Sequence, residues 1–405
     1  MRLWSAATIL VAMAHAPDAS AARSAPPQSP SRSITVPIEL VSNLPFLPVR
    51  VNGSRPLSGI LDSGAGISVV DPRVASELGL LSAGSVQAGG FGQGTDQTLH
   101  LVDQVDLKLG APGNELDLSS QTIAVLPIDY IGSQTGHRTD ALFGHNLFKN
   151  FRITVDYARQ KAVFAPFEAR FRGGGVAIPI DVSGNVPVVE LTLTGEKGVE
   201  VKTRFVVDIG TTSALIMSKQ FLDAHPELTT GKTWVKAPSA SAVGGVIEFN
   251  LIRLAGMALG PFRLDGPIAA VPTKSSGVLA TPGLAGLLGG EVLNRFTVTW
   301  DYQRGQMWLV PNDRLHRRFE ADASGLHLIA RGTSLDEIYV DQVLAGSPAD
   351  RAGLRAGDRI KAAEGKSPRL WELGKLLMRS GSVVRLTIAR DNAERQVQLP
   401  LRALL

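Results

Sequence analysis

Cysteine is absent from this 405-residue sequence. Its absence excludes structural disulfides, thiolate catalysis and zinc sites that depend on cysteine. The seven histidines are scattered, and they form no His-Glu-x-x-His motif or comparable cluster. The sequence therefore predicts no metal site.

Dense positive charge is also missing. The formal net charge is only +4, and the basic residues are spread along the chain. Nucleic-acid binding needs a clustered basic face, so the sequence predicts no nucleic-acid partner.

The N-terminal apolar stretch is too short to span a bilayer. It covers Leu3–Ala14, follows Arg2 and precedes Ala19-Ser20-Ala21, which is the pattern of a cleavable secretory signal over residues 1–21. This predicts a periplasmic or secreted protein with no stable membrane span after cleavage; an uncleaved anchor is the alternative. Residues 22–33 are rich in Pro and Ser, and we expect them to form a disordered linker.

Two aspartates stand in matching contexts. Asp62 follows an apolar run and begins the turn Asp62-Ser63-Gly64, and Asp208 does the same in Asp208-Ile209-Gly210. A carboxylate at the end of a buried strand is costly unless it is used. Two such groups brought together share a proton, so one can act as a base while the other acts as an acid. This pair can activate a water molecule against a peptide carbonyl.

The sequence around each aspartate is repeated. Val36–Leu40 matches Ile178–Val182, Leu142–Gly144 matches Leu287–Gly289, and Phe151–Tyr157 matches Phe296–Tyr302. The simplest account is a duplicated unit. Its short, valine-rich runs favour strands, and we expect lobe 1 to cover residues 34–167 and lobe 2 residues 175–312.

This repeated pattern resembles the retropepsin-like aspartic proteases. The resemblance implies a mainly β protein with two pseudo-symmetric β-barrel lobes that build one active site. It implies an aspartic endopeptidase that acts on peptide or protein substrates without a metal or organic cofactor. The residues that it assigns are catalytic Asp62 and Asp208, with Ser63, Gly64, Gly210 and Thr211 in the active-site loops.

A glycine-centred hairpin follows each aspartate turn. Gly90, Phe91 and Gly92 lie in the first, and Gly244 and Gly245 in the second. Glycine permits positive φ and a close approach of the backbone. In the family that the chain resembles, such hairpins are flaps over a bound peptide; a plain exposed hairpin is the alternative.

Ile209 departs from the family pattern. The family has a hydroxyl residue after each catalytic Asp, which helps to join the two loops, whereas Ile209 has none. Two alternatives therefore stay open. The protein could be a catalytically weak or inactive peptide-binding protein, or a homodimeric protease that uses only lobe 1, where Asp62-Ser63-Gly64 is the better motif.

Residues 322–402 resemble a PDZ domain of the type found in bacterial proteases, a small β-sandwich with two helices. Ser347-Pro348 starts the first helix as N-cap and first helical residue, and a second helix is predicted over Arg369–Met378. The resemblance assigns Gly325, Leu326, His327 and Leu328 to a loop and strand that bind C-terminal peptides through their carboxylate. A domain that only packs against the lobes is the alternative. Trp371 is expected in the domain core or groove wall.

Overall fold

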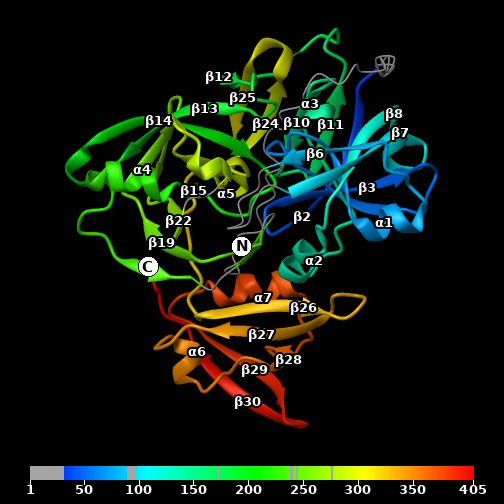
Figure 1. Ribbon diagram of the computed structural model, residues 1–405. Helices are drawn as coiled ribbons and strands as arrows, with labels where there is room; N and C mark the ends of the chain where they lie inside the picture. Colours follow the sequence, from blue (N-terminus) through cyan, green and yellow to red (C-terminus); the bar gives the residue numbers. More distant parts are fainter. Residues whose placement is uncertain (1–31, 89–96, 172, 238–239, 243–244, 275–276) are drawn as a thin grey trace.

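The computed structural model describes residues 32–88, 97–171, 173–237, 240–242, 245–274 and 277–405 (Figure 1). The predicted signal sequence, all but the last two residues of the expected linker, and the hairpin residues Gly90, Phe91, Gly92 and Gly244 lie outside these ranges. The described chain is mainly β, with two β lobes above a smaller C-terminal domain. The predicted fold class is confirmed.

An antiparallel sheet joins the two lobes. Its strands, in spatial order, are β1 (Ile34–Pro37), β11 (Lys161–Ala165), β10 (Arg152–Asp156), β24 (Phe296–Asp301), β25 (Gln306–Pro311) and β12 (Val176–Asp181). The lobes meet at β10 and β24, where the hydroxyls of Thr154 and Thr299 are 2.8 Å apart. Arg152 forms a buried ion pair with Asp301 across the same strands, at 3.0 Å. Equivalent strands of the two repeats therefore pair with each other.

Lobe 1 is a closed barrel. Its strands are β2 (Glu39–Val41), β3 (Leu44–Val51), β4 (Leu57–Leu61), β9 (Ala141–Phe143), β5 (Val69–Val70), β8 (Asn114–Val125), β7 (Gln97–Ala111) and β6 (Gly84–Ala88). Closure comes from an additional pairing of β3 with β7. The helices of this lobe are α1 (Pro72–Glu77), α2 (Asp129–Thr135) and α3 (His145–Phe148).

Lobe 2 repeats the strand arrangement around the aspartate but carries different additional strands, helices and turns. Its strands are β13 (Val188–Thr194), β14 (Glu200–Asp208), β23 (Gly286–Gly289), β15 (Leu215–Met217), β22 (Ile268–Pro272), β19 (Phe249–Arg253), β16 (Trp234–Lys236), β20 (Gly256–Leu259) and β21 (Phe262–Asp265), with a hairpin of β17 (Ala240–Ala242) and β18 (Gly245–Ile247). Its helices are α4 (Lys219–Ala224) and α5 (Gly290–Leu293), with 3-10 turns η1 (Glu196–Gly198), η2 (Pro226–Leu228), η3 (Gly277–Ala280) and η4 (Tyr302–Arg304).

The two aspartate turns arise from the same strand crossing. In lobe 1, β9 runs parallel to β4 and antiparallel to β5; in lobe 2, β23 runs parallel to β14 and antiparallel to β15. The glycine of each apolar-apolar-Gly motif makes this crossing possible. A Cβ at Gly144 would lie 2.3 Å from the Ala65 carbonyl oxygen, and one at Gly289 would lie 2.2 Å from that of Ser213.

The C-terminal domain is a five-stranded antiparallel sheet with two helices. Its elements are β26 (Leu326–Arg331), β27 (Glu337–Val343), α6 (Pro348–Arg351), β28 (Arg359–Ala363), α7 (Leu370–Leu377), β29 (Val383–Arg390) and β30 (Ala393–Pro400). Ser347 caps α6 as predicted, since its Oγ accepts from the Asp350 N–H at 3.3 Å. The second predicted helix is observed one residue shorter at each end, with Arg369 as its N-cap.

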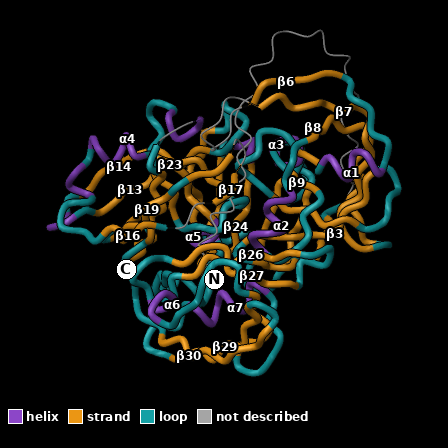
Figure 2. Tube along the Cα trace, turned by 60° about the horizontal axis from the view of Figure 1, so that its bottom comes forward, coloured by secondary structure: helices purple, strands orange, loops and turns teal. Residues whose placement is uncertain are grey.

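Two main cores stabilise this arrangement. The largest buried cluster runs through both lobes and includes Phe151 and Tyr157 from one and Phe296 and Trp300 from the other. The C-terminal domain has a separate core between its sheet and α7, and Figure 2 shows that domain below the lobes. Within the described ranges, no helix is both long and apolar enough to cross a membrane.

Candidate active site

The two aspartates sit at equivalent places. Asp62 directly follows β4 and Asp208 is the last residue of β14, and neither side chain is exposed. Each Oδ1 accepts a hydrogen bond from its own turn, from the Gly64 N–H at 2.9 Å and from the Gly210 N–H at 2.8 Å. Each carboxylate is therefore fixed by the glycine two residues later.

The loops bring the two carboxyl groups together. A Cβ on Gly210 would lie 2.4 Å from Cγ of Asp62, so the Asp208 loop packs directly on the other carboxylate. The groups are close enough for one to hydrogen-bond the other. Oδ2 of each aspartate has no donor within the described part of the protein. Because two carboxylates are both acceptors, a single proton between them is what satisfies this pair.

Burial dominates the electrostatics of the pair. Loss of hydration raises the pKa of Asp208 to about 7. The pKa of Asp62 is raised well above its usual range, first by burial and then by the negative charge of Asp208. The backbone N–H donors of the turns oppose this effect without cancelling it. Such a pair holds one proton over a wide pH range, and that proton belongs to the pair rather than to either residue.

Ser63 joins the two loops. Its Oγ donates to the Val207 carbonyl at 2.7 Å and accepts from the Ile209 N–H at 3.2 Å, so one lobe 1 hydroxyl binds the backbone on both sides of Asp208. Ile209 is completely buried in the core that the two lobes share. The missing hydroxyl thus leaves no polar gap, because lobe 2 replaces it with apolar packing.

Asn43 bonds the lobe 2 turn and Tyr302 lies within the electrostatic reach of Asp62, but neither was assigned to the site from the sequence. Asn43 Nδ2 donates to the Thr212 carbonyl at 2.9 Å, just beyond the Asp208 turn. The buried Tyr302 hydroxyl has no hydrogen-bond partner among the described residues. Burial and the charge of Asp62 raise the pKa of Tyr302 well above its ordinary value. Tyr302 ends the repeated motif Phe296–Tyr302, and Asn43 begins Asn43-Leu44-Pro45, which matches Asn185-Val186-Pro187. That repetition was the available signal.

Of the remaining predicted loop and hairpin residues, the structure describes Thr211 and Gly245. Thr211 is buried, and its carbonyl accepts from the Gly290 N–H at 2.9 Å. The first hairpin is formed by β6 and β7, which pair up to Ala88 and Gln97. Gly245 pairs with Ala242 in the second hairpin and has a φ of +117°.

Two family models match parts of the chain. Residues 47–147 match the aspartyl protease family, and residues 339–390 match the PDZ domain family. The chain carries an aspartyl protease domain and a PDZ domain. The first match contains Asp62 and ends within α3, and the second lies inside the C-terminal domain.

Similar solved structures include two proteases. The crystal structure of an aspartic proteinase from Irpex lacteus is 14% identical, with a TM-score of 0.44, over 69% of this chain and 98% of that chain. The photosystem II D1 C-terminal processing protease is 29% identical, with a TM-score of 0.20, over 22% of this chain and 26% of its own. No curated protein matches the chain.

The predicted carboxylate loop of the PDZ domain is already hydrogen-bonded. The Gly325 N–H donates to Asp322 Oδ2 at 2.5 Å, and the Leu326 N–H donates to Ser324 Oγ at 3.0 Å. His327 and Leu328 are buried, and His327 Nδ1 lies 3.0 Å from an Asp341 carboxylate oxygen. A C-terminal carboxylate would have to displace Asp322 and Ser324 to reach the first two donors.

The PDZ domain is docked against lobe 1. Trp371 of α7 belongs to the same buried cluster as Phe46, Ile128 and Ile131 of that lobe, so it packs outside its own domain core. Helix α2 lies along β26, the edge strand beside α7, and Figures 1 and 2 both show α2 there. The edge that would add a peptide strand therefore faces lobe 1.

Proposed function

We propose that this protein is an exported aspartic endopeptidase, with Asp62 and Asp208 as its catalytic pair. The observation that supports this proposal is the contact between two buried carboxyl groups that lack donors on their Oδ2 atoms. A water molecule held by the pair would lose a proton to the ionised carboxylate as it attacks the scissile carbonyl. The protonated carboxyl would donate to the carbonyl oxygen. The carboxyl that took the water's proton would then protonate the leaving amine as the C–N bond breaks, and the collapsing diol would return a proton to the other carboxylate.

The loops are proposed to hold the pair at a fixed separation. Ser63 ties the Asp62 turn to the Asp208 turn, and Gly210 permits their close approach. A fixed, desolvated geometry lowers the reorganisation that proton transfer needs. We further propose that the hairpins of β6–β7 and β17–β18 act as flaps over a peptide substrate, as in the family that the chain resembles.

The PDZ domain is proposed to bind substrate or partner peptides after α2 moves away from β26. Strand addition at a sheet edge needs free backbone donors, and those of Gly325 and Leu326 are engaged in this structure. The N-terminal signal pattern supports export to the periplasm or the medium.

A homodimer that uses only lobe 1 is not needed to supply a second carboxylate, since one chain contains both. The alternative of a peptide-binding protein without turnover rested on Ile209. We favour the enzyme because Ile209 packs in the shared core and Ser63 alone bonds the backbone on both sides of Asp208.

The decisive experiment replaces each aspartate in the full chain. Asp62→Asn and Asp208→Asn should each abolish cleavage of a mixed peptide library while circular dichroism remains that of the wild type, because a single carboxylate cannot supply both acid and base. Asp265→Asn, at an exposed position of lobe 2, is the matched control. Undiminished cleavage by Asp208→Asn would rule out the single-chain pair.

A further inference from the structure

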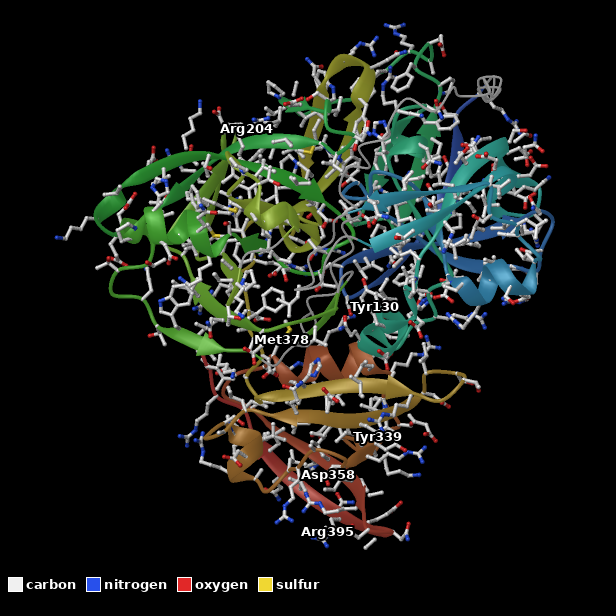
Figure 3. All side chains as sticks on the ribbon, viewed as in Figure 1. Tyr130, Arg204, Tyr339, Asp358, Met378 and Arg395 are labelled. Carbon is white, nitrogen blue, oxygen red and sulfur yellow. The ribbon has the colours of Figure 1, made fainter. Side chains whose placement is uncertain are left out.

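A polar cavity lies where four parts of the chain meet. Its volume is about 350 Å³, and its walls come from both lobes, the connector between lobe 2 and the PDZ domain, and α7. Met378, which lines it, is labelled in Figure 3 where the PDZ domain meets the lobes. Five cationic side chains line the cavity: Arg295, Arg314, Arg317, Arg318 and Lys375.

Arg295 builds the shape of this cavity. Its guanidinium donates to the backbone carbonyls of Arg314 and Leu315, at 3.2 and 3.0 Å, and lies 3.7 Å from the ring centroid of Phe319. These contacts hold the connector against lobe 2. The arginines of the connector are thereby presented on a fixed backbone rather than on a loose segment.

The cations that face the cavity are poorly neutralised. Arg314, Arg318 and Lys375 have no ion-pair partner within the described ranges. Arg317 pairs with Asp313 at 3.2 Å, but both side chains are largely exposed, so this pair is weak. Glu291 and Glu320 also line the cavity, and the cations outnumber them.

Like charges are crowded enough to affect one another. Burial and the nearby Arg317 lower the pKa of Arg295 to about 10. Burial and Arg318 likewise lower the pKa of Arg253, which donates to the Phe319 carbonyl at 2.9 Å. An anion placed among these groups would relieve this repulsion.

We propose that this cavity binds a small multivalent oxyanion that carries phosphate or carboxylate groups. Arginine presents planar pairs of N–H donors that match both groups bidentately. Such a ligand bridges the connector arginines to Lys375 of α7 and so ties the PDZ domain to lobe 2. Asn43 also lines the cavity and donates to Thr212, so the ligand lies behind the active-site loop of lobe 2.

The test measures thermal unfolding of the full-length protein with pyrophosphate, inorganic phosphate or citrate, each against sodium chloride at equal ionic strength. We expect a saturable rise in Tm with at least one multivalent anion. A response to the phosphates alone identifies a phosphate ligand, and a response to citrate alone identifies a carboxylate ligand. An equal rise with sodium chloride would overturn the proposal, because it would reflect screening only.

Variants assign the effect to the cavity. Arg314→Gln/Arg318→Gln should weaken anion affinity roughly tenfold for each charged hydrogen bond that is lost. Arg395→Gln removes the same charge at the far end of the PDZ domain, where Figure 3 labels it, and should bind like the wild type. If the double variant does not fold, Lys375→Gln at an exposed position of α7 takes its place. Unchanged affinity in the variant that is used would overturn the assignment.

Discussion

The two aspartate turns share a hydrogen bond from glycine to the carboxylate but differ in the residue after the aspartate. In lobe 1, Ser63 reaches across to the backbone of lobe 2 with two hydrogen bonds. In lobe 2, Ile209 occupies the equivalent position and packs into the shared core. The same joint between the lobes is therefore polar on one side and apolar on the other. A duplicated site can lose half of a symmetric contact when burial of an apolar side chain replaces it.

The two lobes also differ in their match to the aspartyl protease family. The aspartyl protease match covers residues 47–147, which lie in lobe 1. The PDZ domain also contacts the two lobes differently. Trp371 packs into lobe 1, whereas Leu344 and Leu404 pack against a buried cluster of lobe 2. Lobe 1 thus carries the better motif and receives the large aromatic anchor.

After loss of either aspartate, the largest expected effect comes from filling the space where the lobe 2 turn meets Asp62. Gly210→Ala places a Cβ 2.4 Å from Cγ of Asp62, so the carboxyl groups must separate. Displacement of catalytic groups by about 1 Å can cost on the order of 100-fold in rate. We expect kcat on a peptide substrate to fall by about that factor or more. Gly174→Ala, where a Cβ meets nothing within 4 Å, is the control; equal activity in both would show that the turn can relax.

The second prediction tests Trp371, the PDZ-domain side chain that packs against lobe 1. Trp371→Ala removes a buried ring from the cluster that contains Phe46, a change that costs about 3–5 kcal/mol in a well-packed core. Hydrogen exchange in α2 should become faster as the PDZ domain detaches. Trp234→Ala is the matched control, since that ring is 43% exposed on lobe 2. Unchanged exchange in α2 would show that other contacts hold the domain.

The third prediction concerns Ser63 and Ile209, which make the contact between the lobes polar on one side and apolar on the other. Ser63→Ala loses two inter-lobe hydrogen bonds and should destabilise the protein by about 1–3 kcal/mol. Ile209→Thr should cost a similar amount, because it buries a hydroxyl in a site filled by apolar packing. Urea unfolding measures both free energies. A gain in stability for Ile209→Thr would mean that lobe 2 can form a second polar contact and that the asymmetry is not required.

The smallest effect is the pH dependence of stability. A carboxyl group with a raised folded-state pKa contributes stability that is complete below its ordinary value of 3.8 and is lost as the pH rises through about 7 for Asp208. The free energy of unfolding of the wild type, relative to Asp208→Asn, should therefore decrease over that interval. Urea titrations of both proteins at constant ionic strength measure the difference. Parallel pH curves would contradict the shared-proton pair.

Much of the architecture was predictable because local patterns carry it. The repeated apolar-Asp-x-Gly and apolar-apolar-Gly motifs predicted the duplication, since glycine is required where strands cross closely. Gly144 and Gly289 show why: a side chain at either would collide with a carbonyl oxygen. Ser347-Pro348 predicted the start of α6 because capping depends on adjacent residues alone.

The sequence by itself determined the mainly β fold class, the aspartyl protease and PDZ resemblances and the two aspartates that end buried strands. Only the tertiary structure decided how those parts meet. It placed Gly210 against Asp62, filled the Ile209 position with core packing and turned the PDZ edge strand toward α2. It also gathered Arg295, the connector arginines and Lys375 around one cavity. These contacts join residues far apart in the chain, and no local pattern encodes which of the available surfaces will pack together.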